Sequence, residues 1–96
     1  MKIINLVFDE DDADLLLLPD NVAENLDILF NKFSAWLRIP ENEERFLVPH
    51  NGKRVLGINT KDIVWWLNTY ATSGDEKVII LKQNVKPDPQ YPMEYY

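Results

Sequence analysis

The chain has 96 residues, 46% of them hydrophobic and 27% charged, which are the proportions of one soluble globular domain with a single core. Its formal net charge of -6 argues against direct binding to nucleic acid or to an anionic membrane, because both require a basic surface. The chain contains no cysteine, which excludes disulfides and thiolate chemistry and fits a cytoplasmic protein.

The first predicted element is a strand over Lys2–Phe8, which is short, mostly apolar and β-branched at several positions. It is too short for the apolar region of a signal peptide, and no stretch of the chain reaches the roughly 20 apolar residues of a membrane span. Leu15–Leu18 is predicted as the returning strand. Five of the six residues in between, Asp9–Asp14, are acidic, so we expect this acidic segment to form the tip of a β-hairpin.

A first helix is predicted over Val22–Leu37, where apolar side chains recur every three or four residues. Asp20 or Asn21 can supply the N-cap oxygen, and Glu24 stands three residues after Asn21, in the position of a capping box. Pro40 is expected to end the helix.

After a polar loop at Glu41–Glu44, a second hairpin is predicted from two short runs, Arg45–Pro49 and Arg54–Ile58. The Asn51-Gly52 pair between them is a strong signal for a tight turn. We expect this hairpin at the edge of the sheet, because the proline in its first strand cannot donate a hydrogen bond to a neighbouring strand.

A second helix is predicted over Thr60–Thr72, capped by Asn59 or Thr60, and Lys77–Gln83 reads as a strand with a largely buried centre. The element order is therefore β-β-α-β-β-α-β. This order predicts a single α+β domain over residues 1–83, with both helices packed on one face of a mixed sheet. The proline- and tyrosine-rich segment 84–96 is expected to follow as an extended C-terminal tail.

The acidic segment is the strongest functional signal, and residues 1–44 as a whole carry 11 acidic against 3 basic side chains. Its carboxylates repel one another by roughly a few tenths of a kcal/mol per exposed pair unless a cation or a partner neutralises them. A metal loop of the EF-hand kind does not fit, because Asp14 or Leu15 stands where that loop needs glycine. The segment is then either a solvated turn that protects a sheet edge or a surface for a positively charged partner. The expected partner-binding carboxylates are Asp9, Glu10, Asp11, Asp12 and Asp14, with Asp20, Glu24 and Asp27 as neighbours.

Enzymatic catalysis is not expected. The single histidine, His50, falls in the predicted Asn-Gly hairpin, and the three glycines are too far apart for a phosphate-binding loop. We therefore expect no catalytic residues, no cofactor and no metal site.

Two aromatic side chains are candidates for apolar contacts with a partner. Trp65 falls on the polar side of the second helix, opposite Trp66 and Leu67, where it can anchor an interface or be covered by the sheet edge or the tail. Tyr91 belongs to a tail with three tyrosines in its last six residues, which is too aromatic for an inert end. The tail either packs back on the domain or adds contact area to a partner.

The sequence Glu24-Asn25-Leu26-Asp27-Ile28-Leu29-Phe30, continuing to Trp36-Leu37, resembles the inhibitory helix of the barstar family of ribonuclease inhibitors. The resemblance covers residues 24–37 and implies that Asp27 corresponds to an acidic contact residue, while Asn31 stands where the family has its strongest acidic contact. Over the whole chain, the size, charge and organisation are similar to bacterial toxin-immunity proteins, especially those of contact-dependent growth inhibition. That likeness implies a cytoplasmic protein whose partner is a basic toxin domain.

The function expected from the sequence is stoichiometric inhibition, in which an acidic surface neutralises a basic toxin, most simply a nuclease. One alternative is a phage-encoded anti-CRISPR protein or DNA mimic that would use the same acidic surface. A third hypothesis is a structural or assembly module, in which Trp65 and the tail would matter and the acidic segment would not.

Overall fold

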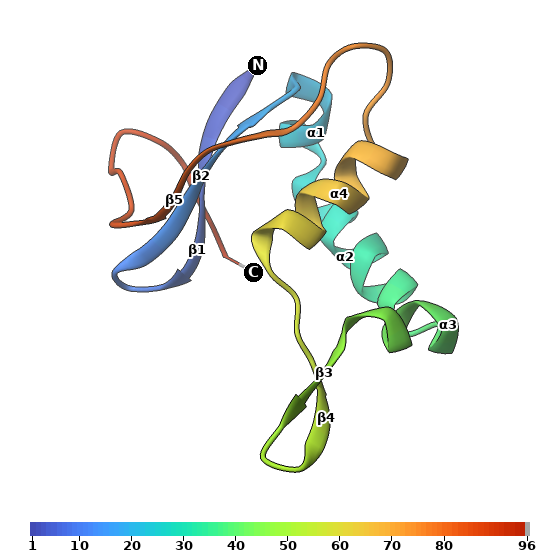
Figure 1. The fold of residues 1–96 in the computed structure, drawn as a ribbon. Helices are drawn as coiled ribbons and strands as arrows, with labels where there is room; N and C mark the ends of the chain where they lie inside the picture. The colour runs from blue at the N-terminus through green and yellow to red at the C-terminus, as the bar shows by residue number, and fades with distance from the viewer. Residues whose placement is uncertain (96) are drawn as a thin grey trace.

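The computed structural model describes residues 1–95, which form an α+β domain (Figure 1). Its main sheet contains β1 (Lys2–Asp9), β2 (Asp12–Leu18), β5 (Ile79–Val85) and β6 (Met93–Tyr95). Its helices are α1 (Asp20–Glu24), α2 (Leu26–Leu37), α3 (Pro40–Glu43), the 3-10 turn η1 (Glu44–Phe46) and α4 (Thr60–Tyr70). A separate hairpin consists of β3 (Leu47–His50) and β4 (Lys53–Leu56). The predicted fold class is confirmed.

The main sheet is mixed, with the strand order β5-β2-β1-β6. β2 runs antiparallel to both β1 and β5, whereas β6 runs parallel to β1. Because Ile4 pairs with Leu16 and Leu6 pairs with Asp14, these four side chains point to the same face of the sheet. That face receives the helices.

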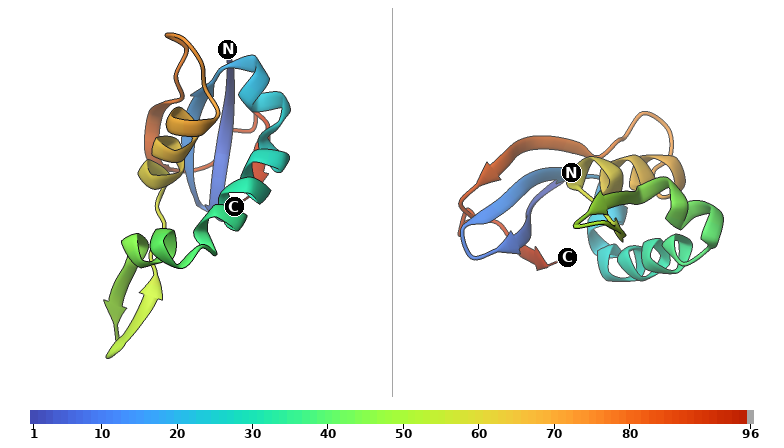
Figure 2. Two further views of the ribbon diagram at one scale, coloured as in Figure 1. Left: turned by 90° about the vertical axis from the view of Figure 1, so that its right-hand side faces the viewer. Right: turned by 60° about the horizontal axis from the view of Figure 1, so that its bottom comes forward.

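The core lies between this face and the helices α2 and α4, which both lie on the same side of the sheet, as predicted (Figure 2). Phe33 of α2 and Trp66 of α4 meet there, with their ring centroids 5.4 Å apart. Around them the core is apolar, with further members in Ile4, Leu6, Leu16, Leu18, Val22, Leu26, Leu37, Ile63, Leu67 and Val78. Of the two predicted caps of α4, Asn59 and Thr60, the structure has Asn59, which forms a capping box with Asp62 through two hydrogen bonds of 3.1 Å.

The first predicted helix is broken in two at Asn25, which has φ −113° and ψ 18°. The Asn25 side chain donates a 2.7 Å hydrogen bond to the carbonyl oxygen of Asn21, a local bond of the kind that competes with helix continuation. The capping box predicted from Asn21 and Glu24 was wrong, because α1 already starts at Asp20 and no side chain caps it. Pro40 does follow the end of α2, but it starts α3, so the predicted polar loop is helical.

The β3–β4 hairpin has the predicted tight turn, with Asn51 at φ 50° and Gly52 at φ 76°. The prediction that it lies at the edge of the sheet was wrong, because it forms a two-stranded sheet of its own. The hairpin projects from the body of the domain (Figure 2). This projection explains a radius of gyration of 13.9 Å, against about 12.5 Å for a compact domain of this length.

The C-terminal segment covers the opposite face of the sheet (Figure 1). From the end of β5 at one edge, the chain crosses this face and returns as β6 at the other edge. Residues 84–95, predicted as an extended tail, thus pack back on the domain, and Tyr96 lies outside the described residues. The centre of β5 was predicted to be buried, but β5 is an edge strand whose Ile79 and Leu81 are 49% and 44% exposed.

Candidate functional site

The acidic segment forms the turn between β1 and β2, as predicted, but the turn itself is short. Only Glu10 and Asp11 lie between the two strands. Asp9 holds the turn closed, because its Oδ1 atom accepts a 3.0 Å hydrogen bond from the backbone nitrogen of Asp11. The side chains of Asp9, Glu10 and Asp11 are exposed and that of Asp12 is half-buried.

These carboxylates are not neutralised by the rest of the domain. The one ion pair among residues 1–95 joins the amino group of Met1 to Asp20, at 2.7 Å. The hydrogen bond and the charge of that amino group lower the pKa of the Asp20 carboxyl. Asp20 follows the far end of β2, so the prediction that it neighbours the acidic segment was wrong.

Asp14 was predicted to belong to the exposed acidic turn, and this prediction was wrong. It lies within β2 and is only 4% exposed, with its side chain on the helix-bearing face of the sheet. Its Oδ1 atom accepts a 2.9 Å hydrogen bond from the backbone nitrogen of Asn84. Because the turn closes at Asp12 rather than after Asp14, the alternation of the strand turns this carboxylate inward.

Glu24 and Asp27 gather around a different residue, Glu94 of β6. The three carboxylates line one depression of about 320 Å³ at the junction of α1, α2 and β6. Burial raises the pKa of Glu94, and the negative charge of Asp27 raises it further. This acidic cluster was not predicted, because Glu94 is 67 residues from Asp27 in the sequence.

The raised pKa of Glu94 predicts a pH-dependent effect of Glu94→Gln. The ordinary value is 4.5, and below it the residue is protonated both folded and unfolded. As the pH rises through the higher pKa of the folded state, ionisation opposes folding and this contribution to stability becomes unfavourable. Glu94→Gln should therefore stabilise the protein in urea unfolding at neutral pH and lose that advantage below pH 4.5. An equal gain at both pH values would contradict this explanation, and Asp75→Asn is the exposed control.

An apolar depression lies beside the acidic segment. Its volume is about 350 Å³, and Asp9 and Glu10 share its lining with five apolar or aromatic residues, Val7, Phe8, Pro87, Met93 and Tyr95. Phe8 is 41% exposed and Tyr95 is 72% exposed. Strand β6 thus borders both the cluster around Glu94 and this depression. Glu94 pairs with Leu6 and Tyr95 with Val7, so these two side chains point to opposite faces of the sheet and are joined by its β6 edge. We call this edge, with Asp9, Glu10, Glu24, Asp27, Glu94 and Tyr95, the β6 surface.

Trp65 is 39% exposed and belongs to an aromatic cluster on the outside of α4. Among residues 1–95, the ring and charge contacts of Trp65 come from α2, α4 and η1, and not from the main sheet or the tail, the two alternatives to an interface role. Instead the Arg45 guanidinium lies 5.1 Å from its ring centroid, and the rings of Trp36 and Tyr70 lie 5.9 and 6.4 Å away. Tyr91 is half-buried in the segment that crosses the opposite face of the sheet, so the fold does not bring the two predicted anchors together.

His50 lies at the exposed end of β3, where its Nε2 atom is 3.3 Å from the side-chain nitrogen of Asn51. Within residues 1–95, no group of three or more histidine or carboxylate side chains is arranged to hold a metal ion. None of the helices in this part of the chain combines the length and the hydropathy that crossing a membrane requires.

Comparisons with protein-family models, curated proteins and solved structures give no match to this chain.

Proposed function

We propose that the protein is a stoichiometric inhibitor of the toxin-immunity kind, which binds a basic protein domain through the β6 surface. The observation that carries the proposal is the pairing of uncompensated charge with apolar surface. Asp9 and Glu10 have no ion pair within residues 1–95, and they border a depression that exposes Phe8 and Tyr95.

Each half of this surface has a separate role in binding. The carboxylates attract a positively charged domain over a distance and speed the encounter, by up to orders of magnitude at low ionic strength. Tyr95 and Phe8 supply the contact area that holds the complex, because partly exposed aromatic side chains are typical interface anchors. A nuclease suits this surface, since its active site gathers Lys and Arg side chains for phosphate groups that carboxylates can replace. Such an inhibitor would act in the cytoplasm, beside the toxin it neutralises.

The test is affinity capture from the native cytoplasm at low salt, followed by measurement of the association rate with the purified partner. In the triple variant Asp9→Asn, Glu10→Gln, Asp11→Asn, the rate should fall by about tenfold or more, and the salt dependence should weaken. The matched control is Asp75→Asn with Glu76→Gln, which removes exposed carboxylates from the loop between α4 and β5. Equal rates in the triple variant and the control would refute the proposal. A captured nucleic-acid-binding complex would favour the anti-CRISPR or DNA-mimic alternative.

An assembly module is the second candidate, because two exposed apolar features lie away from the β6 surface. One is the cluster around Trp65, and the other is the projecting hairpin, where Val48, Val55 and Leu56 are 40–46% exposed. A partner that remains bound at high salt, and that is lost on Trp65→Ala while the triple carboxylate variant still binds, would support this candidate instead.

A further inference from the structure

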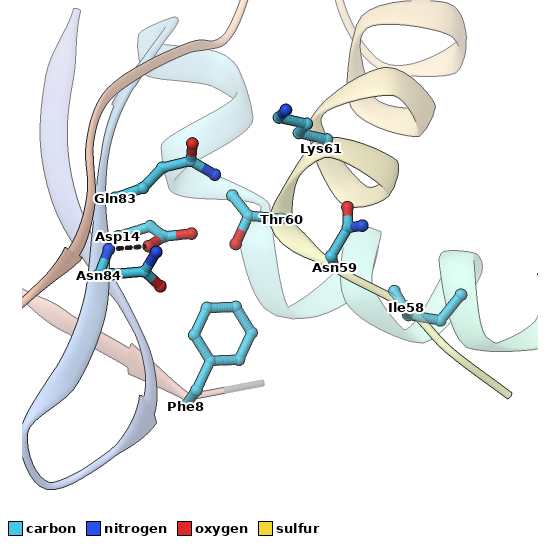
Figure 3. A pocket seen from close by; sticks show the side chains of 8 residues that line it. All are labelled: Phe8, Asp14, Ile58, Asn59, Thr60, Lys61, Gln83 and Asn84. Carbon is cyan, nitrogen blue, oxygen red and sulfur yellow. Dashed lines mark hydrogen bonds between the residues drawn. The ribbon is translucent and has the colours of Figure 1, made fainter. Parts of the chain in front are cut away.

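A polar pocket of about 390 Å³ lies between the main sheet and the N-terminal end of α4 (Figure 3). Asp14 of β2 and the end of β5 form one wall, and the first turn of α4 forms the other. The pocket is lined by Phe8, Asp14, Ile58, Asn59, Thr60, Lys61, Gln83 and Asn84. Its volume is at the lower end of the roughly 300–1,000 Å³ of ligand pockets, which suits a small metabolite better than a nucleotide.

Two buried polar side chains point into this pocket. Thr60 is 3% exposed, and its Oγ1 atom has no hydrogen-bond partner among the described residues. Asp14 is 4% exposed, and one of its carboxylate oxygens is bonded to the backbone nitrogen of Asn84. Figure 3 shows the Thr60 hydroxyl and the second Asp14 oxygen directed toward one another across the pocket. Buried polar groups are normally satisfied, so this unpaired hydroxyl beside a buried carboxylate indicates hydrogen-bonding capacity that a bound ligand can fill.

The backbone at the pocket wall fixes the position of the buried carboxylate. Asn84 has a φ of 55°, a left-handed conformation that asparagine adopts more readily than most residues, and it lies where the register between β2 and β5 shifts. This conformation accompanies the hydrogen bond from its backbone nitrogen to Asp14 and holds the carboxylate in place.

The opposite charge lies at the mouth of the pocket. Lys61 is exposed and lies above Thr60 on the α4 side of the pocket, with Gln83 on the facing wall (Figure 3). Lys61 and Asp14 line the same pocket, yet they form no ion pair with each other. The Phe8 ring and the Ile58 side chain add an apolar part to the lining. The pocket therefore presents a negative group inside, a positive group at its mouth and two separate apolar side chains, with Phe8 below and Ile58 beyond Asn59 (Figure 3).

We propose that this pocket binds a small zwitterion, an α-amino acid with an apolar side chain. Its ammonium group would donate hydrogen bonds to the second oxygen of the Asp14 carboxylate and to Thr60 Oγ1, neither of which accepts a hydrogen bond from another residue among residues 1–95. Its carboxylate would pair with Lys61, and its side chain would lie on Phe8. Phe8 lines both this pocket and the depression of the proposed inhibitor surface. The inference nevertheless rests on other residues, because Asp14, Thr60 and Lys61 are outside the β6 surface.

The experiment uses three ligands of the same carbon skeleton with the intact chain. They are L-leucine, its decarboxylated amine 3-methylbutan-1-amine and its deaminated acid 4-methylpentanoate, each titrated by calorimetry and by amide NMR shifts. We expect L-leucine to bind more tightly than either single-charge analogue, with shifts centred on the amides of Asp14, Thr60 and Asn84. Equal binding of the amine and of L-leucine would overturn the assignment of a zwitterion. Absence of binding by all three ligands would overturn the site.

Variants of the pocket distinguish a site from a structural role. Asp14→Asn and Lys61→Gln should each weaken L-leucine binding by about tenfold or more, the effect of losing a charged hydrogen-bond partner. Thr60→Val should also weaken binding while leaving the midpoint of thermal unfolding unchanged or raised, because its hydroxyl makes no bond in the free protein. Lys53→Gln, which removes an exposed charge from the start of β4, is the control. Unchanged affinity in all three pocket variants would refute the proposal.

Discussion

The free energy of unfolding is expected to fall by about 3–5 kcal/mol when Phe33 is replaced by alanine. Phe33 is 1% exposed, and its ring lies 5.4 Å from that of Trp66 in α4 and 6.1 Å from that of Trp36 in α2. The substitution removes a large ring at the point where both helices pack on the sheet. It leaves a cavity, and packing contacts are lost on several sides of that cavity. Small domains unfold at a cost of about 5–15 kcal/mol, so this loss is a large share of the total.

The measurement is urea unfolding followed by far-ultraviolet circular dichroism. Phe8→Ala is the matched control, because it is the same chemical change at a position that is 41% exposed, and we expect it to cost about 1 kcal/mol or less. If Phe33→Ala does not fold, Phe33→Leu keeps most of the volume and should lose about 1 kcal/mol. A loss for Phe33→Ala no greater than that for Phe8→Ala would show that this ring does not hold the two helices on the sheet.

The parts of the fold that the sequence predicts are those specified by neighbouring residues. The mostly apolar run Lys2–Phe8 predicts the first strand, the Asn51-Gly52 pair predicts the tight turn, and Asn59 predicts the cap of α4. Each of these signals acts within a few residues, through alternation of side chains, a positive φ or a local hydrogen bond. The same reasoning placed both helices on one face of a mixed sheet.

The parts that sequence reasoning missed depend on contacts between distant residues. Asp14 faces inward because the turn closes at Asp12, and its buried carboxylate is satisfied by Asn84, 70 residues away. The acidic run itself does not show where the turn ends, so it does not separate Asp14 from the exposed Asp11. Glu94 meets Asp27 only because β6 returns beside β1. The three-residue strand β6 is too short to show a periodic pattern of its own. The acidic run in the sequence thus forms an exposed turn and, at Asp14, part of a buried pocket wall. The β6 surface also includes Tyr95, which lies at the far end of the chain.

Replacing Asn5 by leucine is expected to destabilise the protein by about 2–4 kcal/mol and to release the C-terminal segment from the sheet. The Asn5 side chain is fully buried. Its amide nitrogen donates hydrogen bonds of 2.8 Å to the carbonyl oxygen of Asp88 and 3.1 Å to that of Tyr91, and its oxygen accepts one of 2.8 Å from the Asp88 nitrogen. Leucine has a similar size but can make none of these bonds. Backbone groups of residues 88–91 would then be left without partners wherever they remain on the sheet.

One measurement and a control variant separate local release from general loss of stability. Amide hydrogen exchange should show protection lost first in β6 and in the segment 86–92, while the amides of β2 stay protected. Asn25→Leu is the control, because Asn25 is exposed and donates a single hydrogen bond to the Asn21 carbonyl. Equal losses in the two variants, with β6 still protected, would contradict the role assigned to Asn5. Since β6 carries Tyr95 and Glu94, release of this segment should also abolish the partner binding that we propose for the β6 surface, whereas the acidic turn at Glu10 would remain intact.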